Sequence, residues 1–137
     1  MTPPVAVGCD IVAIDEIRSS IAAFGEKYLA RVFTERERAE SSGADGVARL
    51  AARYAAKEAA LKALAITDLP TPPRTVETVL DGGVPRLVLH GDFATRAREL
   101  GYEHLAVSLS HTDCHAVAVV VAARSADFLP SARDGVH

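Results

Sequence analysis

The first half of the chain contains one strand-like run of apolar residues, followed by several helical patterns. Residues 5–14 are rich in β-branched side chains, which predicts an opening strand that the charge of Asp10 interrupts. Asp15 can cap the helix that follows, because a carboxylate accepts the free backbone N–H groups of a first turn. Thr34, with Glu37 three residues later, has the spacing of a capping box. The predicted helices cover residues 16–24, 26–32, a short segment after Thr34, and 47–65.

The second half of the chain alternates strand patterns with a single helix. The prolines between residues 70 and 73 separate it from the long helix, since proline disfavours continued helix. An Asp-Gly turn after Leu80 joins two strand-like runs and predicts a hairpin. The expected elements are strands 75–80 and 86–90, a helix over 92–100 capped by Asp92, and strands 105–109 and 116–122. This order predicts one α+β domain over residues 1–124, with a flexible C-terminal tail at 125–137.

Length and composition are those of an ordinary globular domain. The 137 residues suffice for one core but not for two domains, and 49% of them are apolar. Acids outnumber Lys and Arg by 18 to 15, and Trp is absent, which argues against nucleic acid as a partner. Cys9 and Cys114 make no disulfide framework, and we expect small core residues in a reducing compartment. With no secretory signal and no apolar run long enough to cross a membrane, the sequence predicts a cytoplasmic protein.

The long predicted helix places a carboxylate beside its apolar face. At about 3.6 residues per turn, one stripe of this helix contains Leu50, Tyr54, Leu61, Leu64 and Ala65. Glu58 lies at the border of that stripe, where a charge needs a partner. One interpretation is an exposed ion pair with Lys62, one turn later, worth about 0.3–0.5 kcal/mol. The other is that Glu58 holds a cation while Lys62 neutralises phosphate charge.

Asp10 is a second acid in apolar surroundings. It is either a strand-end charge that reaches solvent, or it converges with Glu58 if the opening strand packs beside the long helix. Two carboxylates, completed by water and substrate phosphates, suit Mg²⁺, which rarely has an all-protein site. Arg53, Lys57 and Lys62 on the same helix could then neutralise diphosphate charge. The alternative for these three cations is a solvated basic face.

The polar turn between the last two predicted strands supplies further candidates. Ser108, Ser110 and His111 lie in or beside this turn. Their hydroxyls and imidazole could contact phosphate or protonate a leaving group, although turn polarity alone would also explain them. No HExxH, paired CxxC or Walker sequence occurs, so neither zinc hydrolysis nor P-loop chemistry is indicated.

Three segments of the chain, taken together, carry a family resemblance. They are GCDIVAI at residues 8–14, ARYAAKEAALKAL at 52–64 and VSLSHT at 107–112. Their order and spacing resemble the 4'-phosphopantetheinyl transferases of the small holo-acyl-carrier-protein synthase type, and GGVPRL at 82–87 resembles the family's Gly-x-Pro stretch. The resemblance implies that family's α+β fold, with an antiparallel sheet packed against a long helix. It also implies a homotrimer with coenzyme sites between subunits.

The resemblance further implies a reaction and a role for each candidate. The family transfers 4'-phosphopantetheine from coenzyme A to a serine of an acyl or peptidyl carrier protein, leaving 3',5'-ADP. Asp10 and Glu58 would hold Mg²⁺, with Mn²⁺ as a substitute, and Glu58 or a metal-bound water would accept the serine proton. Lys62 would stabilise charge on the transferred group or assist departure of 3',5'-ADP. The other residues implied at the coenzyme are Arg53, Lys57, Pro85, Ser108, Ser110 and His111.

Two positions depart from the family pattern. Ala106 stands where the family usually has His, so one phosphate contact is lost or comes from His104 or Arg49. Glu16 stands where the family tends to place a basic residue facing an acidic carrier. Because like charges repel, Glu16 predicts an unusual or less acidic carrier, or a contact shifted to Arg18.

The leading hypothesis is therefore an enzyme that loads carrier proteins of fatty-acid, polyketide or peptide assembly. The alternative is a non-catalytic module of the same fold that binds coenzyme A or a carrier, which the two departures favour slightly. A structural oligomerisation domain is a third interpretation, but it would leave Asp10 and Glu58 unexplained.

Overall fold

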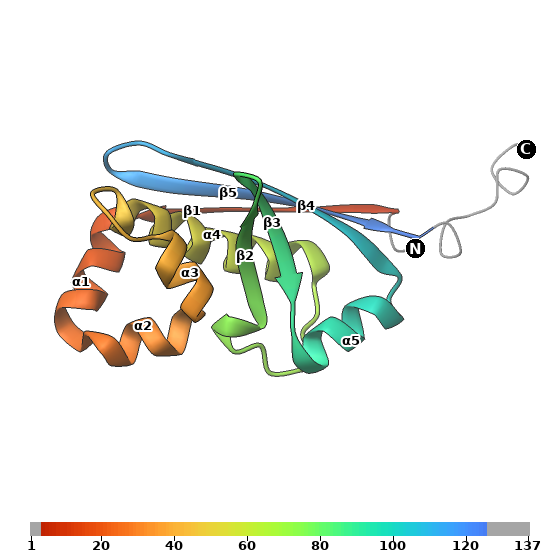
Figure 1. The fold of residues 1–137 in the computed structure, drawn as a ribbon. Coiled ribbons are helices and arrows are strands. Elements are labelled where there is room, and N and C mark those ends of the chain that lie inside the picture. The colour runs from red at the N-terminus through yellow and green to blue at the C-terminus, as the bar shows by residue number, and fades with distance from the viewer. Residues whose placement is uncertain (1–3, 126–137) are drawn as a thin grey trace, which may run out of the picture.

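Strands and helices follow the order expected from the sequence (Figure 1). The structure is a computed structural model and describes residues 4–125. Its elements in chain order are β1 (Val5–Ala13), α1 (Ile14–Phe24), α2 (Glu26–Val32), α3 (Glu35–Glu40), α4 (Gly46–Leu64), the 3₁₀ helix η1 (Pro73–Thr75), β2 (Val76–Asp81), β3 (Val84–Leu89), α5 (Gly91–Glu99), β4 (Tyr102–His111) and β5 (His115–Arg124). The strands β1, β5 and β4 form one antiparallel sheet in that order, and β2 and β3 form a separate hairpin. The α+β prediction is confirmed.

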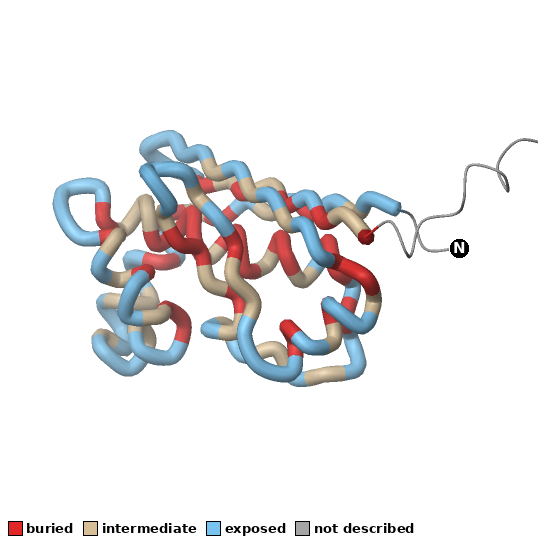
Figure 2. The backbone as a smooth tube through the Cα atoms, turned by 45° about the vertical axis from the view of Figure 1, so that its right-hand side comes forward, coloured by how far each residue is buried: buried red, intermediate tan, exposed pale blue. Residues whose placement is uncertain are grey.

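Helix α4 covers one face of the three-stranded sheet. In Figure 1 it runs beneath β1, β5 and β4, while α1 to α3 gather at one end of the molecule and α5 at the other. The β2–β3 hairpin contacts both α4 and β4. Figure 2 shows the buried residues concentrated where α4 meets the strands, which is the centre of the core. Among the described residues, no helix combines the length and apolarity needed to cross a membrane.

The buried face of α4 consists mainly of alanines and differs from the predicted stripe. Leu50 and Leu64 are buried as expected, but Tyr54 and Leu61 are only partly buried. Ala65 is exposed and ends the helix in a left-handed conformation. The alanines at the core are Ala51, Ala52, Ala55, Ala56, Ala59, Ala60 and Ala63. Such small side chains let the helix axis approach the sheet closely. A pattern that counts only large apolar residues does not predict this alanine face.

Helix starts are predicted correctly in one case and wrongly in two. Thr34 caps α3 through a complete capping box with Glu37. Asp15 and Asp92 do not cap α1 and α5, because these helices begin one residue earlier and both acids lie in the first turn. There a carboxylate still interacts favourably with the positive end of the helix dipole.

Ser125 is the one residue of the predicted C-terminal tail that the structure describes. Ser125 is buried and its N–H donates to the carbonyl of Gly101 at 2.7 Å. The rest of the predicted tail, residues 126–137, lies outside the described part of the chain.

Strand β1 and helix α4 approach each other closely at Gly8. A Cβ atom on Gly8 would lie 2.0 Å from the carbonyl oxygen of Ala59 and 2.7 Å from the backbone nitrogen of Ala63. Both are backbone atoms of α4, which no side-chain rotation can move away. Alternation along β1 then directs Asp10, two residues later, to the same side of the strand. The sequence Gly-x-Asp therefore combines a close contact with an acid facing α4.

Replacing Gly8 by alanine should destabilise the fold by more than about 3 kcal/mol, because the added methyl group meets rigid backbone. Denaturant unfolding checks this value. The matched control is Gly82→Ala in the β2–β3 turn, where a Cβ has no neighbour within 4 Å and only the positive φ of 59° opposes the change. A Gly8→Ala variant as stable as Gly82→Ala would contradict the close packing of β1 on α4.

Candidate active site

Asp10 and Lys62 join β1 to α4 at the edge of the larger sheet. The Lys62 Nζ donates to Asp10 Oδ1 and to the carbonyl oxygen of Cys9, both at 3.1 Å. The side chain of Asp10 is 18% exposed and that of Lys62 is 57% exposed. The carboxylate is therefore held at the border of the core while the ammonium group remains accessible to a ligand.

Glu58 lies on the same helix one turn before Lys62 and is partly exposed. Tyr54 lies one further helical turn back, and the pKa of its hydroxyl depends on the charges near Glu58. Burial raises the pKa of Tyr54 first, and the charges of Glu58, Asp10 and Glu16 raise it further. Asp10 and Glu58 therefore both contribute negative charge to the region of Tyr54. That the two acids converge on one cation stays a prediction.

The donor set fits a hard cation bound mainly by non-protein ligands. Within residues 4–125 there is no group of three or more His, Cys, Asp or Glu side chains that could hold a metal ion. Asp10 and Glu58 could supply two carboxylates, and water and phosphate oxygens would then complete an octahedral Mg²⁺ site. An ion held in this way binds best together with a phosphorylated substrate.

Arg53 points into the protein and is only 3% exposed. Its Nη1 donates to the carbonyl of Arg49 at 3.3 Å, and its Nε has no hydrogen-bond partner. Burial lowers the pKa of Arg53, an effect that the charges of Glu40 and Glu37 oppose. The sequence-based alternative of a solvated basic face is therefore wrong for Arg53.

Lys57 is also buried, at 2% exposure, and its ammonium group already has two partners. The Nζ donates to Glu37 Oε1 at 2.7 Å and to the carbonyl oxygen of Val76 at 2.6 Å. The solvated basic face is wrong for Lys57 as well. The structure connects Lys57 to α3 and β2, and it does not bring this side chain to Asp10.

The candidates on β4 are divided between the two faces of the sheet. Ser108 and Ser110 are exposed, and they pair with Val119 and Val117 of β5. Because paired residues of neighbouring strands share a face, all four side chains lie on the face of the sheet opposite α4. His111 pairs with Ala116 and borders a cavity of about 160 Å³ near the start of α4. In a single chain, the two serines are therefore separated from Asp10 by the sheet.

Pro85 belongs to the smaller sheet, where it pairs with Leu80 across the hairpin. It is partly buried and its strand contacts β4. The position of Pro85 relative to the candidate site therefore depends on how the whole β2–β3 hairpin packs against α4.

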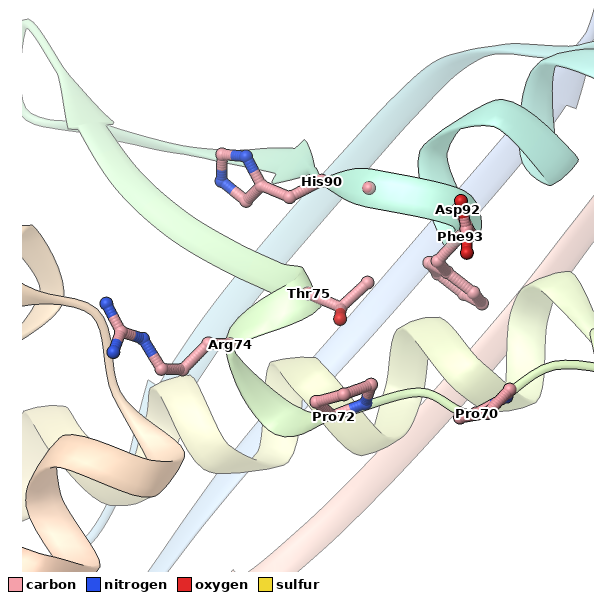
Figure 3. A pocket seen from close by; sticks show the side chains of 8 residues that line it. Pro70, Pro72, Arg74, Thr75, His90, Asp92 and Phe93 are labelled. Carbon is pink, nitrogen blue, oxygen red and sulfur yellow. The ribbon is translucent and has the colours of Figure 1, made fainter.

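A larger cavity, of about 410 Å³, lies between η1 and the start of α5 (Figure 3). In Figure 3, Arg74, Thr75 and His90 line it from one side, and Phe93 from the other. It contains none of the residues predicted for the metal or the coenzyme, so we do not place the chemistry there.

Two contributors to the site were not singled out from the sequence. Tyr54 was assigned to the core stripe, although a tyrosine at a border position beside Glu58 can present its hydroxyl to the acid. The sequence indicates Glu37 only as a capping-box residue. Nothing in the neighbouring sequence indicates that Glu37 also pairs with Lys57. That contact joins residues that are 20 positions apart.

Comparison with known proteins identifies the family of this chain. The family model for the 4'-phosphopantetheinyl transferase superfamily matches residues 6–120, and the chain belongs to this family. A holo-[acyl-carrier-protein] synthase of Chloroflexus aggregans is 44% identical over 129 residues, which cover 84% of this chain and 92% of that relative. A holo-[acyl-carrier-protein] synthase of Koribacter versatilis is 42% identical, over 83% of this chain and 94% of the relative.

Solved structures of the same class have the same fold. The Chronobacterium ammoniagenes ACPS–CoA complex superposes with a TM-score of 0.77 at 28% identity, covering 90% of this chain and 99% of that one. The Helicobacter pylori holo-[acyl-carrier-protein] synthase in complex with coenzyme A gives a TM-score of 0.74 at 26% identity, over 85% and 99% of the two chains. The family resemblance stated from three short segments is confirmed.

The phenol of Tyr54 provides a test of the acid cluster. Burial first, and then the charges of Glu58, Asp10 and Glu16, raise the pKa of Tyr54 in the folded chain. Asp10→Asn and Glu58→Gln should each lower this pKa towards 10.0, and Mg²⁺ should lower it in the wild type by neutralising the same carboxylates. Phenolate absorbance, with Tyr54→Phe as the background, measures the shift.

The control for this titration is Glu103→Gln, an exposed carboxylate at the start of β4. It should leave the Tyr54 titration unchanged. If Asp10→Asn and Glu58→Gln also leave it unchanged while circular dichroism shows an intact fold, the two acids do not meet beside Tyr54.

Proposed function

We propose that this chain is a Mg²⁺-dependent holo-acyl-carrier-protein synthase acting in the cytoplasm. It transfers 4'-phosphopantetheine from coenzyme A to a serine of a carrier protein and leaves 3',5'-ADP. The observation that supports this most strongly is the contact of Lys62 on α4 with Asp10 on β1, with Glu58 one turn before Lys62, in a chain of this family. The two free, exposed cysteines, Cys9 and Cys114, are compatible with a reducing compartment.

The two carboxylates would hold the ion against the diphosphate of coenzyme A. When bound, Mg²⁺ or Mn²⁺ supplies positive charge that offsets the charge developing on the phosphate oxygens. The continuous strand β1 and the contact of Gly8 with α4 would position Asp10 for metal binding. Glu58 is positioned by the rigid helix on which it lies.

The reaction breaks the phosphoanhydride bond of coenzyme A and forms a phosphodiester with the carrier serine. The carrier serine oxygen attacks the phosphorus that bears the pantetheine arm, and the bond from that phosphorus to the bridging oxygen of 3',5'-ADP breaks. Glu58 or a nearby water accepts the serine proton. Little covalent chemistry is required of the protein, so rate enhancement comes from alignment and charge neutralisation.

Lys62 neutralises Asp10 in the ligand-free chain and is free to turn towards phosphate once substrate arrives. At 57% exposure its side chain has room for this movement, and only two of its three N–H groups have partners. The ammonium group would then stabilise the negative charge on the departing 3',5'-ADP.

An exposed apolar surface on the larger sheet supports assembly of the chain into a homotrimer. Val5, Val7 and Ile11 of β1 are 54%, 66% and 63% exposed, and Val121 of β5 faces the same side. Cys9 lies among them, and Cys114 is exposed in the turn before β5, so the expectation of buried core positions is wrong for both cysteines in the single chain. Exposed apolar surface of this kind is typical of an interface between subunits.

Assembly through this surface would also explain the separated candidates. Ser108 and Ser110 share the exposed face with the apolar residues, and coenzyme bound between subunits would contact them from a second copy. Pro85 and His111 remain proposed coenzyme contacts, whereas Arg53 is buried in the single chain. Light scattering of the purified chain measures the number of subunits.

The carrier-binding surface is proposed from the position of Glu16 on α1. Glu16 is exposed and lies close enough to Tyr54 to affect its pKa. Arg18 forms an ion pair with Asp15 within the same helix, so its charge is partly neutralised. This start of α1 is therefore acidic overall, which favours a less acidic carrier than is usual for the family.

Turnover is favoured over a module that only binds. All three charged groups of the proposed centre are present, and the relatives with 42–44% identity are holo-[acyl-carrier-protein] synthases. A non-catalytic module would not need Asp10, Glu58 and Lys62 to meet.

Mass spectrometry of an apo carrier protein tests the reaction. Incubation with this chain, coenzyme A and Mg²⁺ should add one phosphopantetheine arm to the carrier serine. Glu58→Gln should slow this transfer by about 10²–10³-fold, the cost of losing a group that stabilises transition-state charge. Chelation of the metal should stop it, and Mg²⁺ or Mn²⁺ should restore it.

The matched control for the transfer assay is again Glu103→Gln, which should transfer at the wild-type rate. Coenzyme A binding without any mass gain across diverse carriers would favour the binding module. Transfer that survives complete removal of divalent metal would contradict the role given to Asp10 and Glu58.

A further inference from the structure

Along the edge of β2 that does not pair with β3, side chains form the hydrogen bonds that the backbone of a neighbouring strand would otherwise form. This strand pairs only with β3 in the described part of the chain. On its other edge, the carbonyl of Val76 accepts from Lys57 Nζ at 2.6 Å, and the N–H of Thr78 donates to Glu37 Oε2 at 3.1 Å. The N–H of Leu80 donates to the Glu40 carboxylate at 2.9 Å. The edge of β2 is thus fixed to α3 and α4 by hydrogen bonds of charged groups.

The pair of Lys57 and Glu37 is the buried centre of this arrangement. Their side chains are 3% and 0% exposed, and Glu37 also accepts the N–H of Thr34 at 3.0 Å. The ring of Phe33 lies 5.7 Å below the Lys57 ammonium group. Each of these charges would be left unpaired in the interior if the other were removed, which makes the pair an all-or-none connection.

The same pair connects the two parts of the proposed active site. Lys57 directly precedes Glu58, so fixing its ammonium group on β2 fixes the rotation of α4 at the metal-binding carboxylate. On the other side, β2 leads through Leu80 to Pro85, which is paired with it in the hairpin. The hydrogen bonds of Lys57 and Glu37 therefore lie on the connection between Glu58 on α4 and Pro85 on the hairpin.

We propose that Lys57, with Glu37, is a positioning residue of the transferase rather than a coenzyme ligand. The pair holds the β2–β3 hairpin in register with α4, so that Pro85 and Glu58 meet the coenzyme at the same time. This inference rests on the proposed function, and it assigns to Lys57 a role different from the phosphate contact that the sequence suggests. No reaction at Lys57 itself is involved.

The test is a double-mutant cycle measured by steady-state kinetics, below the unfolding temperature of every variant. Lys57→Met leaves Glu37 unpaired and should lower kcat/KM for coenzyme A by about 10²-fold, as expected for misplacement of about 1 Å. Adding Glu37→Gln removes the unpaired charge and should recover at least about tenfold of this loss, because neutral replacement of both partners is far better tolerated than loss of one. Lys27→Met, at an exposed lysine of α2, is the matched control and should have wild-type kinetics.

Two kinetic outcomes would overturn the proposal. If Lys57→Met raises KM for coenzyme A at unchanged kcat and Glu37→Gln restores nothing, Lys57 contacts the coenzyme directly. If the folded single and double variants both keep wild-type kcat and KM, the pair has no influence on the site.

Amide hydrogen exchange separates this proposal from the proposed function. In Lys57→Met, exchange should accelerate at Thr78 and Leu80 and also in α4 around Glu58, and Glu37→Gln should reverse both changes. Faster exchange confined to β2, with α4 unchanged, would overturn the positioning role. A wild-type chain that transfers nothing to any carrier would instead refute the proposed function, while the exchange result still decides the positioning role.

Discussion

The close contact between β1 and α4 is the constraint on which the rest of this structure depends. Gly8 leaves no space for a side chain against the backbone of Ala59 and Ala63, and the alanine face of α4 keeps the helix near the sheet along its length. Close packing is usually discussed as a source of stability. Here it also has a chemical consequence, because the strand residue two positions after Gly8 is Asp10, and the helix residue one turn before Lys62 is Glu58. A looser packing would separate the two acids.

The other side of the same helix is held by charge rather than by close backbone contact. The buried pair of Lys57 and Glu37 fixes α4 to α3 and to the edge of β2. Buried ion pairs often contribute little net stability, since desolvation offsets their attraction. Their geometric effect is independent of that balance, because unpaired charges in the interior are strongly disfavoured. Helix α4 is thus oriented by Gly8 on one side and by Lys57 on the other, with Glu58 between them.

Local sequence was sufficient for much of this account. The order of elements, the capping box at Thr34 and the meeting of Asp10 with the long helix follow from patterns of a few residues. The burial of Arg53 and Lys57 does not follow from such patterns, because whether a basic residue of a helix is solvated depends on which element packs over it. The partner of Lys57 is 20 residues away and already had a local explanation as a helix cap. The cysteine prediction failed for a related reason, since Cys9 lies on the outer face of an edge strand.

The most direct test of the central claim is a crystal structure of the chain with Mg²⁺ and coenzyme A. The account predicts one ion bound by a carboxylate oxygen of Asp10 and one of Glu58, each at about 2.0–2.1 Å, with phosphate and water oxygens completing an octahedron. An ion bound by only one of these acids, or carboxylates that point away from each other in the presence of both ligands, would contradict it.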